Sequence, residues 1–157
     1  MIYEILYLLK EPLGDQAAEA SKTGVRGLIA AKTALNPCDV IEKFKAILHE
    51  RPYEFRYALR ILPVEKVVET DLEIIGFAAA ELAMEIGVAE SFRITVEKRF
   101  TKLHARDIVE AVAKRIDRRV DLHNPDKVLL IEVVGKFTGI SIIQPDLILS
   151  VQKEKML

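Results

Sequence analysis

The spacing of apolar residues along the chain predicts a mixture of short strands and helices. An apolar run at residues 2–9, rich in residue types that suit strands, predicts a first strand, which Pro12 and Gly14 end. The alanine-rich stretch 15–22 predicts a brief helix, and residues 25–33 predict a second strand. The N-terminal part is therefore expected to combine strands with helices.

Two later helices have recognisable starting residues. Asn36 is placed to cap the first, Pro37 occupies its first helical position, and apolar residues at helical spacing follow as far as Arg51. Thr70 and Glu73 form a capping-box pattern, in which each side chain can bond the other residue's backbone N–H. Each helix should bury one apolar stripe.

The C-terminal half predicts a strand, a helix and two more strands. Residues 92–97 alternate between apolar and polar, which favours a strand with one buried face, and an amphipathic helix is expected over 108–120. After a turn at 124–126, the apolar run 128–134 predicts a strand covered on both faces, and 140–143 predicts another. The strand–helix–strand order fits a right-handed crossover between parallel strands. The fold class is therefore α+β.

Residues 55–68 are expected to be extended, with a break at Pro63, because proline lacks the N–H that an interior strand would use. This break is also the predicted domain boundary. The tail at 152–155 is expected to be frayed.

The composition is that of an ordinary globular chain: 157 residues, 50% hydrophobic and 30% charged. Cys38 is the single cysteine, so no internal disulfide can form, and no leader-like segment precedes the first apolar run. No stretch approaches the ~18 consecutive apolar residues of a membrane-spanning helix. We therefore expect a cytoplasmic protein that is not integral to a membrane.

Charge is distributed unevenly along the chain. Residues 1–90 hold 10 Lys/Arg and 15 Asp/Glu, whereas residues 91–157 hold 13 and 9. The excess is greatest from Arg93 to Arg119, where nine basic residues stand against four acidic ones. This segment is the first indication of a polyanion partner.

Signatures of catalysis and of metal binding are missing from the chain. It has no nucleophile elbow, no Walker A loop, no G-x-G-x-x-G and no H-E-x-x-H. The chain has three histidines and one cysteine, and the spacing along the sequence of His49, His104 and His123 does not match that of a zinc site. The G-x-x-G at 24–27 matches the loop of a KH domain in spelling only, since that loop should join two helices. We expect no metal and no enzyme activity.

The basic residues that follow the strand at 92–97 suit phosphate binding. Lys98, Arg99 and Lys102 precede a predicted helix N-terminus, which itself attracts anions. Phe100 is a candidate for base stacking and equally a candidate for the core. The candidate RNA-binding residues are Lys98, Arg99, Lys102, Arg106, Lys114 and Arg115.

Several segments of the chain resemble a THUMP domain. They are F-x-I-x-V-x-K-R at 92–99, Asp107-Ile108 in the following helix, and VDL-x-NPD at 120–126. With RILPV at 60–64 and GISI at 139–142, the chain is similar to the archaeal and eukaryotic stand-alone THUMP proteins that assist tRNA cytidine acetylation. In the 120–126 segment, the aliphatic residues are expected to fill the core and the polar ones to hold the turn.

The resemblance implies both a domain organisation and a function. Residues 1–62 would form a ferredoxin-like segment packed with a THUMP-type α/β domain at 63–157, a mixed sheet with a parallel β-α-β unit. THUMP domains bind structured RNA, mostly tRNA. Proteins of this type use no cofactor and present tRNA to a separate RNA acetyltransferase, which uses acetyl-CoA and ATP. The seven residues after Ser150 leave no room for a catalytic domain, which favours this adaptor role.

Two alternatives of other classes stay open. The chain could be a small α+β enzyme or ligand-binding domain with a site at Glu65, Glu69 and Asp71, although these residues also suit a solvated helix entry. It could instead be a self-associating scaffold, if the apolar strand at 2–9 lay at a sheet edge. The oligomeric state is not determined by the sequence.

Overall fold

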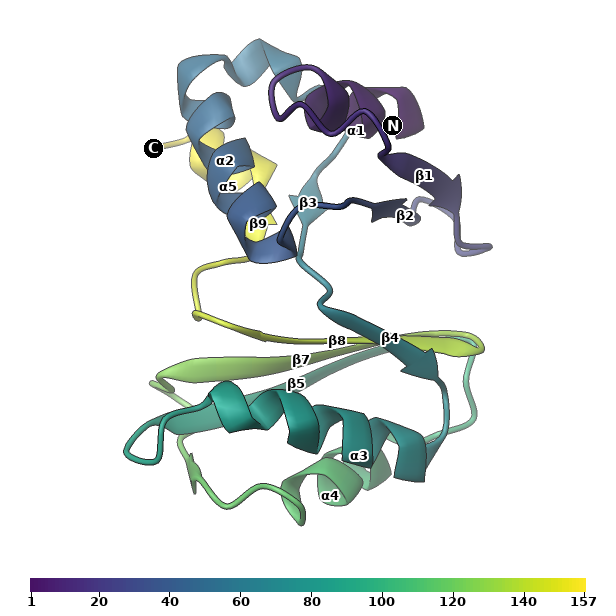
Figure 1. Cartoon of the computed structure of the whole chain (residues 1–157), viewed down its shortest axis with the longest axis vertical. Helices are drawn as coiled ribbons and strands as arrows, with labels where there is room; N and C mark the ends of the chain where they lie inside the picture. Colours follow the sequence, from purple (N-terminus) through teal and green to yellow (C-terminus); the bar gives the residue numbers. More distant parts are fainter. The chain divides into compact units, whose positions relative to one another are not determined.

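The chain folds as two units in a computed structural model that describes residues 1–157 (Figure 1). Unit 1 comprises Met1–Pro63 together with Asp146–Leu157, and unit 2 comprises Val64–Pro145. No helix is both long and apolar enough to cross a bilayer.

Unit 2 is a five-stranded mixed sheet with two helices on one face (Figure 1). The strand order is β4-β8-β7-β5-β6, and only the pairs β5–β7 and β5–β6 are parallel. The α+β class and the mixed sheet with a parallel β-α-β unit are confirmed. In chain order the elements are β4 (Lys66–Glu69), α3 (Leu72–Leu82), the 3-10 helix η2 (Ala83–Glu85), β5 (Ser91–Arg99), α4 (Ala105–Ala113), β6 (Arg119–Val120), β7 (Lys127–Val134) and β8 (Phe137–Ile143).

The core of unit 2 lies between the sheet and the two helices. Alternate residues of β5, β7 and β8 face the helices, as the period of two in the sequence requires. Fully buried members include Phe92, Ile131 and Ile140 from the sheet and Ile75 and Ile108 from α3 and α4. Apolar burial on this face is what fixes the strand register.

Gly76 allows α3 and α4 to approach closely. A Cβ atom at this position would lie 2.9 Å from the Ala111 carbonyl oxygen and 2.8 Å from a guanidinium nitrogen of Arg115. Replacing Gly76 by alanine should therefore force the helices apart and cost about 1–3 kcal/mol of unfolding free energy. Urea unfolding would measure the loss, and a midpoint equal to that of the unmodified protein would contradict the close approach.

Unit 1 contains two separate two-stranded antiparallel sheets and three α-helices. The order α1-β1-β2-α2-β3 follows the last five elements of a β-α-β-β-α-β ferredoxin-like order. The elements are α1 (Ile2–Lys10), β1 (Glu19–Lys22), β2 (Ile29–Lys32), α2 (Pro37–Glu50), the 3-10 helix η1 (Pro52–Glu54), β3 (Arg60–Ile61), β9 (Leu149–Ser150) and α5 (Val151–Lys155).

The expected strand at residues 2–9 is wrong, because this segment is helix α1. Ile5, Leu8 and Leu9 are buried at helical spacing, while Tyr3 and Tyr7 remain on the open side. A nearly continuous apolar run fits both the 3.6-residue period of a helix and the two-residue period of a strand, so the pattern does not distinguish a helix from a buried strand. The short helix expected at 15–22 is also wrong, since its second half is strand β1.

Three other local expectations are corrected. The capping box at Thr70 does not form: Asp71 is the N-cap of α3, and the Thr70 hydroxyl instead lies 2.8 Å from that of Thr138. Helix α4 ends at Ala113, so Val120 lies in β6 rather than in the helix. The tail is not frayed but forms α5, where Lys155 donates to the Phe55 carbonyl.

The C-terminal residues 146–157 cluster with unit 1, although the sequence-based division places them with 63–157. The pairing of Ile61 with Leu149 and of Arg60 with Ser150 brings the chain back to the N-terminal unit. Leu149 and Val151 are buried there. A single domain boundary placed in the sequence cannot represent a C-terminal segment that packs on the N-terminal unit.

Asp15 joins the start of the first hairpin to the residues before α2. Its carboxylate accepts bonds from the Thr33 hydroxyl at 2.5 Å and from the Ala34 N–H at 2.9 Å, and these bonds hold its pKa below the usual 3.8. The ionised carboxylate therefore adds stability above about pH 4, and this contribution is lost as the pH falls through the lowered pKa. The Asp15→Asn protein should melt below the unmodified protein at pH 7, and the difference should shrink in acid. A constant difference in thermal melts from pH 7 to pH 3 would contradict this role.

Candidate nucleic-acid interface

The C-terminal ends of the parallel strands β5 and β7 meet at one edge of the sheet. We call this region the carboxyl edge; it comprises those strand ends, the loop Phe100–His104 with the first turn of α4 (Ala105–Ala113), and the turn Gly135–Lys136 with Phe137 at the start of β8. The N–H of Gly135 donates to the Arg99 carbonyl at 2.8 Å, so the turn is bonded to the end of β5 where the loop begins. In open α/β sheets, ligands bind outside the carboxyl ends of the strands.

Phe100 projects into solvent at the start of the loop. The residue is 75% exposed, and its backbone has φ +56°, a left-handed conformation that residues other than glycine rarely adopt. Of the two roles open to Phe100, burial in the core is excluded. Backbone strain of this kind is retained where surrounding contacts impose it, often at binding sites.

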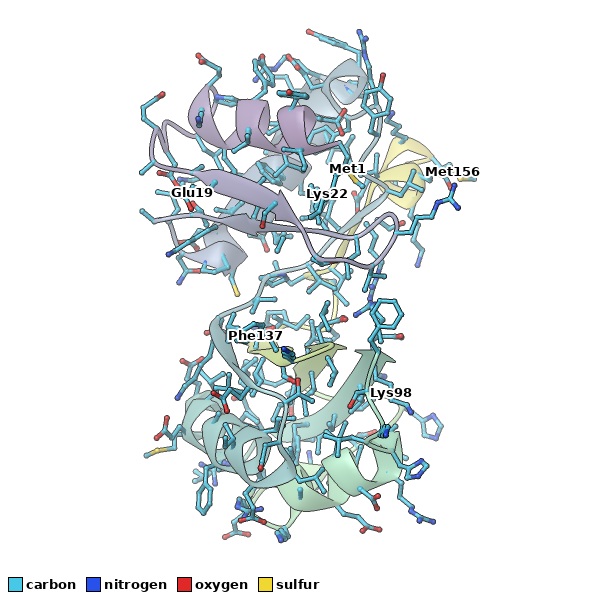
Figure 2. The ribbon with its side chains drawn as sticks, turned by 90° about the vertical axis from the view of Figure 1, so that its right-hand side faces the viewer. Met1, Glu19, Lys22, Lys98, Phe137 and Met156 are labelled. Atoms are coloured by element: carbon cyan, nitrogen blue, oxygen red, sulfur yellow. The ribbon has the colours of Figure 1, made fainter.

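Four of the six candidate cations lie at the carboxyl edge. Lys102 is exposed and makes no ion pair, and Arg106 is exposed with a guanidinium nitrogen 4.0 Å from Asp107. Lys98, labelled in Figure 2, donates to the Leu103 carbonyl at 3.1 Å and so closes the loop. Arg99 differs from these residues because it pairs with Glu132 of β7 at 2.8 Å.

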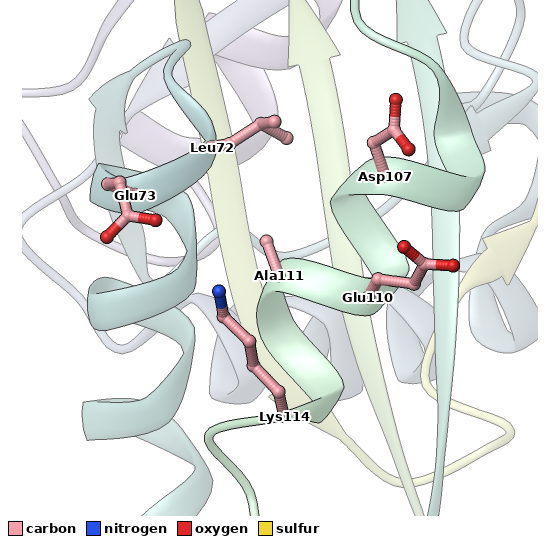
Figure 3. A pocket seen from close by; sticks show the side chains of 6 residues that line it. All are labelled: Leu72, Glu73, Asp107, Glu110, Ala111 and Lys114. Atoms are coloured by element: carbon pink, nitrogen blue, oxygen red, sulfur yellow. The ribbon is translucent and has the colours of Figure 1, made fainter.

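The other two candidates lie at the far end of α4. Arg115 is largely buried: it bonds Glu73 and the Ala111 carbonyl and stacks over the Phe77 ring at 4.4 Å. Lys114 borders a shallow pocket between α3 and α4 (Figure 3). The other lining residues are Leu72, Glu73, Asp107, Glu110 and Ala111, so carboxylates dominate it. This pocket is unsuited to phosphate.

Charge asymmetry along the chain does not carry over to the folded units. Unit 2 holds 12 Lys/Arg and 14 Asp/Glu, so the segment that appears basic in the sequence belongs to a slightly acidic unit. Folding brings Glu73 of α3 onto Arg115, just after α4, and Glu69 of β4 beside Lys136. The exposed cations of the loop, rather than net charge, distinguish the carboxyl edge.

Two residues of the carboxyl edge were missed by sequence reasoning. Lys136 and Phe137 are both exposed, and the Lys136 carbonyl accepts the N–H of Thr70 at 2.9 Å. Strand pairing sets Phe137 opposite both Val134 and Glu69, in the row that ends at Arg99. The sequence contained a signal for these two residues. The glycine turn that follows the apolar strand at 128–134 must lie at the carboxyl end of that strand, and therefore at the same edge of the sheet as the loop after the parallel strand at 92–97.

The 120–126 segment holds its turn differently from expectation. Val120 and Leu122 are exposed and do not fill the core. Asp121 accepts the N–H groups of His123 and Asn124, and Asp126 accepts both the N–H and the hydroxyl of Ser91, which lowers the pKa of each carboxyl group. The expectation that the aliphatic residues fill the core is therefore wrong, and the segment is held by these carboxylates together with the backbone pairing of Val120 and Asp121 with Phe92.

The alternative acidic site is dispersed. Burial raises the pKa of Glu65, whose carboxylate accepts the N–H of Ile142 at 2.8 Å. Glu69 instead borders a shallow hollow with Thr70, Lys136 and Phe137. No cleft gathers several carboxylates with raised pKa. The scaffold alternative loses its premise, because residues 2–9 are helical and offer no strand edge.

Unit 2 is thus an α+β domain with a parallel crossover and an exposed cationic loop at its carboxyl edge. The family described as THUMP domain matches residues 69–143. This chain therefore contains a THUMP domain. A search of curated protein sequences finds no match.

Two solved structures share the fold. The crystal structure of PH1313 from Pyrococcus horikoshii OT3 is 20% identical with a TM-score of 0.64, covering 94% of this chain and 48% of that one. A 4-thiouridine synthetase in complex with RNA and ATP is 14% identical with a TM-score of 0.51, covering 94% and 36%. This chain spans half or less of the length of either structure.

Proposed function

We propose that this chain binds tRNA through the carboxyl edge of its THUMP domain. The observation that carries the proposal is the exposed carboxyl edge of a THUMP domain, where Lys102 in the loop and Arg106 in the first turn of α4 have no strong internal partner. The likeness of the fold to a synthetase solved with RNA is consistent with it. Phosphate oxygens are the ligands that such free cations bind.

The residues of the loop have separate tasks. Lys102 and Arg106 contact phosphates directly, next to the N-terminus of α4, where N–H groups also favour an anion. Lys98 and Arg99 position the loop through the Leu103 carbonyl and Glu132, and Lys98 stays exposed enough to reach a phosphate. Phe100 offers a ring for an unstacked base.

Replacing Lys102 and Arg106 together by glutamine should weaken tRNA binding about tenfold. Two lost phosphate contacts should also reduce the salt slope of the binding constant by roughly 1.5. A mobility-shift titration at two salt concentrations measures both quantities.

The matched control is Lys114→Gln with Arg119→Gln, which removes the same charge from exposed positions of the same unit. Its affinity should stay within about twofold of the unmodified protein, because Lys114 lies in the acidic pocket. Equal losses in the two double variants would show that binding follows net charge, and would contradict the assignment to the carboxyl edge.

The finer role that we propose is a non-catalytic, cytoplasmic adaptor. The chain presents tRNA to a separate RNA acetyltransferase, which forms N4-acetylcytidine with acetyl-CoA and ATP. The segments 60–64 and 139–142, which are similar to those of stand-alone THUMP proteins of this type, support the proposal.

Reconstitution tests the adaptor role. Acetylcytidine in tRNA should form when chain, acetyltransferase and both cosubstrates are combined, and should fall sharply without the chain or with Lys102→Gln/Arg106→Gln. Acetylation that is equally fast without the chain would refute the adaptor role and leave tRNA binding intact. Acetylation by the chain alone would refute the non-catalytic assignment.

A further inference from the structure

All four tyrosines of the chain lie in unit 1, on α1 and on the segment that follows α2. Tyr3 is 88% exposed, Tyr53 63% and Tyr57 66%, and Tyr7 is partly exposed. The buried aromatic residues of this unit are phenylalanines instead. Several large rings open to solvent in one region mark an interaction surface.

Hydrogen bonds hold the two tyrosine-bearing segments side by side. The Glu4 carboxylate accepts the backbone N–H groups of Arg56, Tyr57 and Ala58 at 2.6–3.1 Å. The Tyr7 hydroxyl donates to Glu54 at 3.2 Å. The segments therefore run antiparallel, with Tyr3 at the Tyr57 end and Tyr7 at the Tyr53 end. We call this region the tyrosine surface.

Arginines alternate with the tyrosines on this surface. Arg51, Arg56 and Arg60 all fall within residues 51–60, and the last two are exposed and make no ion pair.

The carboxylates nearest to these arginines are already engaged. Glu4 accepts backbone N–H groups, and Glu54 accepts from Tyr7 and lies 3.6 Å from Arg51. Glu11 lies beyond Tyr7 at the end of α1, so an anion is favoured at the opposite, Tyr3–Tyr57 end. The Arg56 guanidinium donates through Nε to the Tyr53 carbonyl at 3.3 Å, so its charge stays unpaired beside a ring. Rings facing solvent with guanidinium groups that make no ion pair between them are complementary to a polyanion that carries flat groups.

We propose that the tyrosine surface binds unpaired nucleotides of RNA. Bases stack on the rings of Tyr3, Tyr53 and Tyr57, and Arg56 and Arg60 bind the phosphates between them. This contact goes beyond the proposed tRNA site, because it lies on the other unit and recognises single strands. RNA is favoured over a protein partner because the rings stand open to solvent rather than bordering a pocket, and stacking requires only a free ring face.

The intrinsic fluorescence of the protein reports on this surface alone. The chain has no tryptophan, so its emission comes from four tyrosines, all of them here. Adding an oligouridylate of about ten nucleotides to the full chain at low salt should quench the tyrosine emission, and added salt should reverse the quenching. Unchanged emission at low salt would overturn the proposal and favour a protein as the occupant.

Paired substitutions separate stacking from other effects. Tyr53→Leu with Tyr57→Leu should weaken binding of a labelled oligouridylate at least about tenfold, whereas Tyr53→Phe with Tyr57→Phe should retain it, because only the ring is needed. Both pairs are made in the Lys102→Gln/Arg106→Gln chain, so that the carboxyl edge contributes little. Equal losses in the leucine and phenylalanine pairs, or no loss in the leucine pair, would overturn stacking.

The same variants distinguish this proposal from the tRNA site. The leucine pair in an otherwise unmodified chain reports on the tyrosine surface, and Lys102→Gln/Arg106→Gln reports on the carboxyl edge. If oligouridylate does not quench tyrosine emission while tRNA still binds, only the proposal for the tyrosine surface is refuted. If tRNA does not bind while oligouridylate still quenches the emission, only the proposal for the carboxyl edge is refuted.

Discussion

Replacing Arg99 by methionine is expected to lower the free energy of unfolding by about 2–3 kcal/mol. Arg99 pairs at 2.8 Å with Glu132, whose side chain is only 9% exposed. Strand pairing also sets Glu97 directly opposite Glu132, so the guanidinium offsets two carboxylates. Removing it leaves a buried charge without a partner. The loss stays below the ~3–5 kcal/mol of a fully buried pair because Arg99 is itself 25% exposed.

The double variant Arg99→Met/Glu132→Met is the control for this prediction. Removing both charges should restore stability to within about 1 kcal/mol of the unmodified protein, because the buried carboxylate is gone. Urea unfolding of both proteins gives the comparison. If the double variant were as unstable as the single one, Arg99 would act through packing rather than through its charge.

The Phe92→Ala variant should lose about 3–5 kcal/mol of unfolding free energy. Phe92 is fully buried in β5 and belongs to the core between the sheet and the helices of unit 2, so the missing ring leaves a cavity there. Phe137→Ala, at the exposed first residue of β8 in the same sheet, makes the same chemical change and should cost less than about 1 kcal/mol. Equal shifts in the two urea midpoints would contradict the placement of the core.

Features set by neighbouring residues could be predicted from the sequence. Asn36 accepts the N–H groups of Cys38 and Asp39 as expected, because a cap depends on only three residues. The parallel pairing of β5 with β7 followed from the strand–helix–strand order. The prediction of a strand at 2–9 is wrong because an apolar run fits the period of a helix as well as that of a strand. Tertiary packing, which buries Ile5 and Leu8 at helical spacing, selects the helix.

Adjacency in the chain already placed Lys98, Lys102 and Phe100 in one loop. Sequence alone does not show which cations are engaged elsewhere, because Arg115 meets Glu73, 42 residues away, and Arg99 meets Glu132, 33 residues away. The tyrosine surface was missed for the same reason. Its two halves are about 50 positions apart, and they meet only because Glu4 bonds the backbone at residues 56–58.

A titration of the purified chain with total tRNA tests the central claim most directly. It is run at two salt concentrations, against duplex DNA of equal charge as the competitor polyanion. Binding that is stronger for tRNA and weakens as salt rises is the predicted result, since phosphate contacts release counterions and an exposed aromatic ring favours unpaired bases. Absence of tRNA binding at low salt, or equal affinity for the duplex, would contradict tRNA recognition by this THUMP domain.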